Sequence, residues 1–233
     1  MEKTISNTGY FFVALLILTF FGFYITYFGT FPEFKNTTSI QHFHAIIFLS
    51  WFALLITQPF LIRYKKFALH RRLGKVSYFL MPLVLLSIYL ACRSQFENGV
   101  VQNMPLEVNR ALVFMPMQAM FLFGFFYLLG ILNTRNTSSH MRYIVASSLV
   151  LMGPALGRIF ILWLGMDPHD GIWYGGLLPT DIALFALLIW DIVKQKRSYA
   201  YAVALAVSAT CHVAWYMNFG EMQIWQSIAA VIF

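Results

Sequence analysis

The sequence predicts an all-α integral membrane protein, built as a single helical domain over residues 1–233. Sixty percent of the residues are hydrophobic and only 11% are charged, whereas a soluble domain carries about a quarter charged residues. A chain this apolar lacks the polar side chains needed to cover a fold in water. Apolar runs of about 20 residues, enough for a helix to cross the hydrocarbon, recur along the chain, and positive charge collects in alternate links between them.

Seven apolar runs predict a bundle of about seven transmembrane helices. In chain order they cover residues 9–31, 40–62, 76–92, 111–132, 143–166, 173–193 and 199–217. The first run is too long for a signal-peptide core and has no small-x-small cleavage site, so we expect a retained helix. The third run is short and is expected to extend back through Leu73. The apolar tail 222–233 is too short to span, and we expect it in the interface or docked on the bundle.

The charged residues predict the orientation of the bundle. Six basic residues occupy the link between the second and third runs: Arg63, Lys65, Lys66, Arg71, Arg72 and Lys75. If this link is cytoplasmic, alternation places six more on the same face: Lys3, Arg135, Arg142, Lys194, Lys196 and Arg197. The acidic residues Glu33, Glu97, Glu107, Asp167, Asp170 and Glu221 fall on the other face. By the positive-inside rule, the N-terminus is cytoplasmic and the C-terminus is outside.

The net charge of +7 is thus explained by topology, with lipid rather than nucleic acid as the partner. The two cysteines, Cys92 and Cys211, lie in apolar runs and form neither a disulfide framework nor a zinc motif. No P-loop, G-x-S-x-G, H-E-x-x-H or CxxC pattern occurs. Ser147 and Ser148 with His140 form a weak hydrolase pattern, and the short links leave little room for an extramembrane catalytic domain.

Five polar residues are expected in the outer half of the membrane: His44, Gln118, Arg158, Asp181 and His212. Ionisable groups at such depth usually face the bundle interior or a cavity. Arg158 and Asp181 lie at similar depths on successive helices, which predicts an ion pair that either clamps the helices or lines a ligand, ion or proton path. If Pro179 marks the start of the sixth helix, Asp181 is a shallower first-turn residue.

Small residues surround Arg158. Gly153 and Gly157 are four residues apart and permit close helix packing. Pro154 between them frees a backbone carbonyl, so this stretch predicts either tight packing alone or a kink beside a cavity.

His70 and His140 form a second polar group, at the cytoplasmic starts of the third and fifth helices. Each histidine follows a helix that runs from the outside to the cytoplasm, and each precedes a helix that contains a proline further along. This repeated pattern suggests a duplication of helix pairs. The basic residues beside them are also suited to lipid phosphates.

The residues that carry a resemblance run from His44 through Gln58 and Pro59 to His70-Arg71-Arg72-Leu73-Gly74, and they include the later His140-Met141-Arg142 and Arg158. It resembles an uncharacterised family of bacterial multi-pass membrane proteins with His-Arg-x-x-Gly and His-x-Arg helix starts. Residues 40 to 165 are covered, and the chain departs at Met141 and Tyr143, where a basic residue and a tryptophan are expected. The resemblance implies a helical bundle in a bacterial inner membrane and implies no reaction.

Three functional hypotheses remain open. In the first, the outer polar layer binds or transports a small ligand, ion or proton. In the second, the protein is a haem-dependent oxidoreductase of the cytochrome b561 type, with haem b ligated by His70 with His140 and by His44 with His212. In the third, it is a non-catalytic sensor, assembly factor or subunit of a larger membrane complex.

Overall fold

A computed structural model describes residues 3–35, 37–196 and 198–233, with side chains from residue 7 onward. Every regular element in these ranges is helical. The long elements are α1 (Lys3–Gly22), α2 (Ser39–Arg63), α4 (Ser77–Val101), α5 (Leu106–Leu132), α6 (Thr137–Val150), α9 (Leu178–Val193) and α10 (Ala200–Tyr216). The short ones are η1 (Phe28–Thr30), α3 (Phe67–Gly74), α7 (Met152–Arg158), η2 (Ile159–Trp163), α8 (Pro168–Asp170), η3 (Gly171–Leu177), η4 (Phe219–Glu221) and α11 (Gln223–Ile232).

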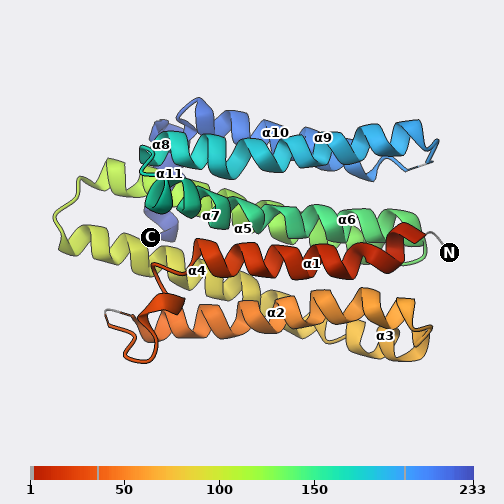
Figure 1. Ribbon diagram of the computed structural model, residues 1–233. Coiled ribbons are helices and arrows are strands. Elements are labelled where there is room, and N and C mark those ends of the chain that lie inside the picture. The colour runs from red at the N-terminus through yellow and green to blue at the C-terminus, as the bar shows by residue number, and fades with distance from the viewer. Residues whose placement is uncertain (1–2, 36, 197) are drawn as a thin grey trace.

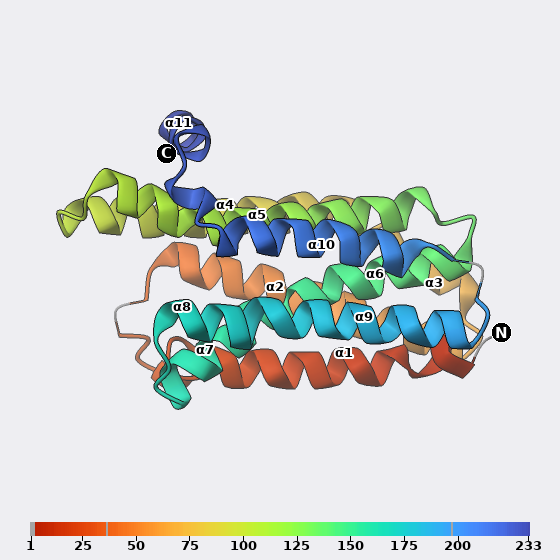
Figure 2. The same cartoon turned by 90° about the horizontal axis from the view of Figure 1, so that it is seen from above.

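The long helices lie side by side along a common axis, as two perpendicular views show (Figures 1 and 2). Among the long helices, the pairs that pack most extensively are α5 with α6, α1 with α2, and α2 with α4. Helix α11 runs across this axis and is seen end-on in Figure 2, at one end of the bundle. Its Trp225 ring nitrogen donates to the Arg110 carbonyl oxygen at 2.7 Å, which docks the helix on α5. Of the two positions expected for the apolar tail 222–233, the structure shows docking on the bundle.

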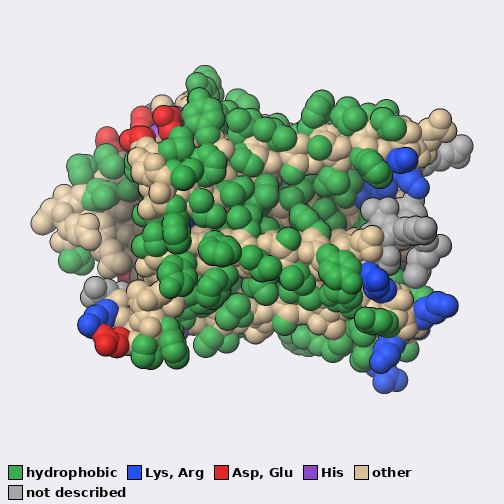
Figure 3. All heavy atoms as spheres, in the orientation of Figure 1, with side chains coloured by type: hydrophobic (Ala, Val, Ile, Leu, Met, Phe, Trp, Pro, Cys, Tyr) green, Lys and Arg blue, Asp and Glu red, His purple; other side chains and the backbone are tan. Residues whose placement is uncertain are grey.

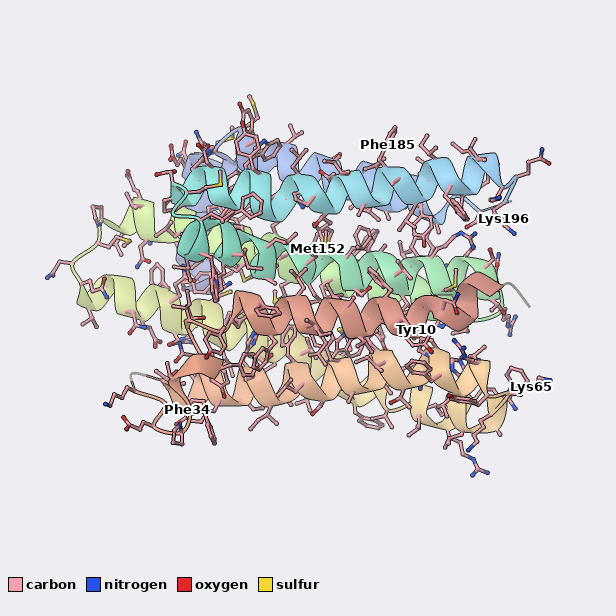
Figure 4. All side chains as sticks on the ribbon, viewed as in Figure 1. Tyr10, Phe34, Lys65, Met152, Phe185 and Lys196 are labelled. Carbon is pink, nitrogen blue, oxygen red and sulfur yellow. The ribbon has the colours of Figure 1, made fainter. Side chains whose placement is uncertain are left out.

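Five helical segments have the length and composition to cross a membrane. They are Ser39–Arg63, Ser77–Val101, Leu106–Leu132, Thr137–Trp163 and Pro168–Val193. The apolar stretches Asn7–Gly22 and Ala200–Tyr216 are shorter. Large apolar side chains point outward along the bundle, as Phe185 does in Figure 4, where more than half of its surface is exposed. Apolar residues cover the face in Figure 3, as expected of a protein whose solvent is lipid.

Several predicted helix boundaries are wrong. The first helix ends at Gly22, nine residues before the predicted end, because the chain then turns through η1. The third run does not extend back through Leu73, since α3 is a separate helix that ends at Gly74. Instead α4 continues forward to Val101 and absorbs much of the predicted outer link. Polar residues such as Arg93 and Glu97, which are salt-bridged four residues apart, are compatible with a helix although they end a hydropathy run.

The two ends of the bundle differ in charge. Lys and Arg gather at the end that holds α3, and Asp and Glu at the end that holds α8 (Figure 3). Lys65 and Lys196, from different links, lie at the first of these ends, while Phe34 lies at the other (Figure 4). We call these the basic end and the acidic end. The segregation of charge expected from the sequence is thus present in the fold.

Candidate functional site

Asp181, Ser208 and His212 form a hydrogen-bonded triad between α9 and α10. The Ser208 hydroxyl donates to Asp181 Oδ1 at 2.6 Å, and His212 Nδ1 lies 2.8 Å from Asp181 Oδ2. An ionised carboxylate only accepts hydrogen bonds, so Nδ1 of His212 carries a proton in this contact. The side chains of His212 and Asp181 are only 5% and 17% exposed. Ser208 and His212 share a face because they are four residues apart on one helix.

The depth of Asp181 depends on how α9 begins. Leu178 and Pro179 do open α9, and Asp181 lies in its first turn, as the alternative reading of Pro179 predicted. No loop precedes this turn, however, because the π-helical η3 continues directly from α9 toward the acidic end. Asp181 therefore lies within the segment Pro168–Val193 of membrane-spanning length and not at its mouth.

A small cavity borders the triad. Its volume is about 10 Å³, and His212, Gln118 and Thr180 contribute to its lining. This is room for about one water molecule, and three polar side chains are the number of partners that a buried water needs. Gln118 needs such a partner, since its Oε1 is buried without a hydrogen bond to any described residue. The structure thus brings together three of the five predicted outer residues: Gln118, Asp181 and His212.

Two glycines hold the backbones close together beside this cavity. A Cβ added to Gly176 would lie 3.1 Å from the Gly153 carbonyl oxygen, and one added to Gly153 would lie 3.3 Å from the Gly176 carbonyl oxygen. The helix α7 therefore packs directly on η3, as the small residues around Pro154 predicted. Both glycines line the cavity.

The predicted ion pair between Arg158 and Asp181 is wrong. The Arg158 guanidinium lies over the Phe23 ring, 4.3 Å from its centroid, and Nη1 donates to the Pro154 carbonyl oxygen at 3.1 Å. Among the described residues it forms no salt bridge. Similar depth on successive helices did not bring the charges together, because Asp181 faces α10 while Arg158 faces the end of α1.

His44 lies apart from the triad and contacts α4. Its Nδ1 lies 3.1 Å from the Ser87 hydroxyl oxygen of α4. The single Ser87 proton is donated to the Val84 carbonyl at 2.7 Å, so His44 Nδ1 is the donor in their contact. Arg158 lies within electrostatic range of His44. The outer layer expected from the sequence is therefore split into a triad with Gln118 on one side and His44 with Arg158 on the other.

His70 and His140 both lie toward the basic end, within electrostatic range of one another. His140 Nδ1 is 2.7 Å from the Gly130 carbonyl oxygen near the end of α5. His70 Nδ1 is 3.4 Å from the Gln58 backbone carbonyl near the end of α2. Each histidine thus meets a backbone carbonyl of the preceding long helix, which agrees with a duplicated helix pair.

The Gln58 side chain supports His70. Oriented to satisfy its neighbours, its amide nitrogen donates to His70 Nδ1 at 2.5 Å and its oxygen accepts from the Gly74 N–H at 3.1 Å. Burial, followed by the nearby His140 and Arg71 charges, lowers the pKa of His70, while its backbone contact at Gln58 opposes the shift. The neutral imidazole is therefore the favoured form here.

A buried ion pair that the sequence analysis missed joins α6 to α9. Arg142 Nε donates to Asp191 Oδ2 at 2.5 Å and Nη2 donates to Oδ1 at 2.7 Å. The two side chains are 3% and 4% exposed. The guanidinium also donates to Ser138 and lies over the Tyr201 ring. Arg142 was counted as a link residue, although Asp191 at the same end of the sixth run was an available signal.

Protein-family models, curated proteins and solved structures contain no match to this chain. The family resemblance inferred from the His-Arg-x-x-Gly and His-x-Arg motifs therefore stays a prediction.

Proposed function

We propose that this chain is a multi-pass bacterial inner-membrane protein that binds or transports a proton, or a small ligand together with a proton, through Asp181 and His212. The observation that carries the proposal is the 2.8 Å contact between a carboxylate and an imidazole inside apolar helices. Ionisable groups at this depth are expensive unless they are paired, and they commonly mark proton paths. The adjoining cavity has room for the water that would pass a proton to or from the pair.

The proton balance of the pair is simple. A neutral His212 that donates Nδ1–H to an ionised Asp181 leaves one basic nitrogen, Nε2, and one net negative charge. Uptake of one proton at Nε2 makes the pair neutral overall, which reduces the energetic penalty of holding charge in an apolar environment. The pair is therefore neutral overall after uptake of a single proton, and on its release the negative charge of Asp181 is stabilised by the hydrogen bonds from Ser208 and His212.

The topology we propose has seven spans, with the basic end in the cytoplasm. The 20 residues of α1 and the 17 residues of α10 extend for about 30 Å and 26 Å at 1.5 Å per residue, close to the hydrocarbon thickness of about 30 Å. The position of Lys65 and Lys196 at the same end of the bundle supports this count (Figure 4). Cysteines substituted at the two positions should react only with a membrane-permeant reagent in intact cells. Labelling of either one by an impermeant reagent would overturn the topology.

Infrared difference spectra between about pH 5 and pH 8, where histidine usually changes charge, test the proton site. The wild-type protein in lipid should show carboxyl and imidazole bands that Asp181→Asn and His212→Gln both remove. Thr210→Ala, on the exposed face of α10, is the matched control and should leave the spectrum unchanged. Proteoliposomes with an internal pH dye then show whether the same variants slow proton movement. Identical difference spectra for wild type and Asp181→Asn would refute the proposal.

Haem b ligation by His70 and His140 is a second candidate, favoured by their lying within electrostatic range of one another and by the His140 hydrogen bond. A ligating histidine generally donates its other N–H to a carbonyl or carboxylate, as His140 Nδ1 does to Gly130. For His70 the equivalent acceptor is the Gln58 carbonyl, and the Gln58 side chain would have to turn its oxygen to Nδ1. A Soret band in purified protein that His140→Ala abolishes would support this function. Protein that stays colourless after haem supplementation would exclude it.

A further inference from the structure

An apolar pocket opens on the side of the bundle between α5, α10 and the C-terminal elements η4 and α11. Its volume is about 310 Å³, within the range of sites for small molecules. Phe114, Phe121, Ala214 and Trp225 are among the lining residues. More than half of the Phe121 surface is exposed, on a helix of membrane-spanning length, so the pocket is reached from the lipid side.

Gln118 is the one lining residue with a carboxamide, and the indole N–H of Trp225 is already donated to the Arg110 carbonyl oxygen. Only 7% of the Gln118 surface is exposed, and its Oε1 is buried without a hydrogen bond to any residue that the structure describes. A buried polar atom without a partner is destabilising, and a bound group that donates a hydrogen bond would relieve this. Gln118 also lines the small cavity beside His212, so this one residue borders both spaces.

We propose that the pocket binds an uncharged lipophile, a hydrocarbon chain with an alcohol or carbonyl head group, whose oxygen hydrogen-bonds the Gln118 carboxamide. The apolar walls suit the chain, and a carboxamide both donates and accepts, so it matches either head group. An ionised head group is excluded, because no lining side chain is charged and a buried charge without a partner is very unfavourable. The site goes beyond the proton function and does not require Asp181 or His212.

Trp225 provides the readout because it lines the pocket. The purified full-length protein in lipid nanodiscs is titrated with a medium-chain ω-bromo alcohol, and separately with the bromoalkane of equal chain length. Bromine quenches tryptophan on contact, and the pocket signal is the quenching that Trp225→Phe removes. In the wild-type protein the alcohol should half-saturate at a concentration about three- to tenfold below that of the alkane, the effect of one hydrogen bond.

Gln118→Leu should abolish this preference for the alcohol and leave quenching by the alkane in place. Gln102→Leu, made at the exposed end of α4, is the matched control and should retain the preference. Ala214→Phe fills the pocket and should weaken both probes. Thermal melts of each variant confirm that it is folded. Equal half-saturation concentrations for alcohol and alkane in the wild-type protein would overturn the proposal, as would full quenching in Ala214→Phe. Loss of the preference for the alcohol in Asp181→Asn would contradict the independence of this site from the proton site.

Discussion

Removal of Arg142 should be among the most damaging single changes in the bundle. In Arg142→Leu, the Asp191 carboxylate keeps its buried position but loses both hydrogen bonds from the guanidinium, at 2.5 Å and 2.7 Å. With 4% of the Asp191 side chain exposed, water cannot replace them. Asp191 must then become protonated or move, and either response destabilises the contact between α6 and α9.

The expected loss for one broken buried pair is about 3–5 kcal/mol. Because about 1.4 kcal/mol is a tenfold change in an equilibrium constant, the unfolding equilibrium should shift by roughly a hundredfold to several thousandfold. In the double variant Arg142→Leu/Asp191→Leu no charge is left without a partner. Apolar replacement of both members of a buried pair is often neutral or stabilising, so the double variant should be more stable than Arg142→Leu.

Reversible unfolding in mixed micelles, followed by circular dichroism, measures both variants against the wild-type protein. Lys194→Leu, in the exposed link after α9, controls for the loss of a positive charge at the basic end. Lys194→Leu should change stability little, because surface substitutions usually shift it by about 0.5 kcal/mol or less. A double variant with the summed losses of the two single variants would refute the reasoning, because it would show that the residues do not interact.

Three other predictions follow from the same structure. Arg158→Ala and Asp181→Ala should have additive effects on unfolding, since the residues are not paired; a coupling above about 0.5 kcal/mol in a double-mutant cycle would contradict the geometry. Gly22→Ala should destabilise the packing of α1 on α7, because its Cβ would lie 2.5 Å from the Ala155 carbonyl oxygen; a melting temperature equal to wild type would disprove the contact. The lowered pKa of His70 means that the unfolded chain takes up a proton, from about pH 6.5 downward, before the folded protein does. Stability should therefore fall as the pH drops below about 6.5 and level off below the folded pKa. His70→Gln should flatten this dependence in pH-dependent melts, and an unchanged slope would exclude the assignment.

The helical character of the chain was predictable because transfer into lipid depends on each residue in turn. Hydropathy can be summed along the sequence, and basic residues such as Lys65 and Lys196 can be counted in each link, without knowledge of which residues are in contact. The shortlist of buried polar residues followed for the same reason, since a histidine or carboxylate in an apolar run is expensive wherever the helix faces. Helix ends were less predictable, because Gly22 ends α1 where the chain turns, whereas α4 continues through charged residues.

Which polar residues meet was decided only by the tertiary structure. A hydropathy run gives depth but not the rotation of its helix, and a rotation of 100° per residue turns neighbouring side chains to different partners. Depth alone favoured Arg158 as the partner of Asp181, whereas the rotation of α9 turns Asp181 toward His212 on α10. The same rotation turns Asp191 toward Arg142. Sequence by itself therefore determined that charged groups are buried in this protein, while helix packing, through contacts between segments far apart in the chain, determined their pairing.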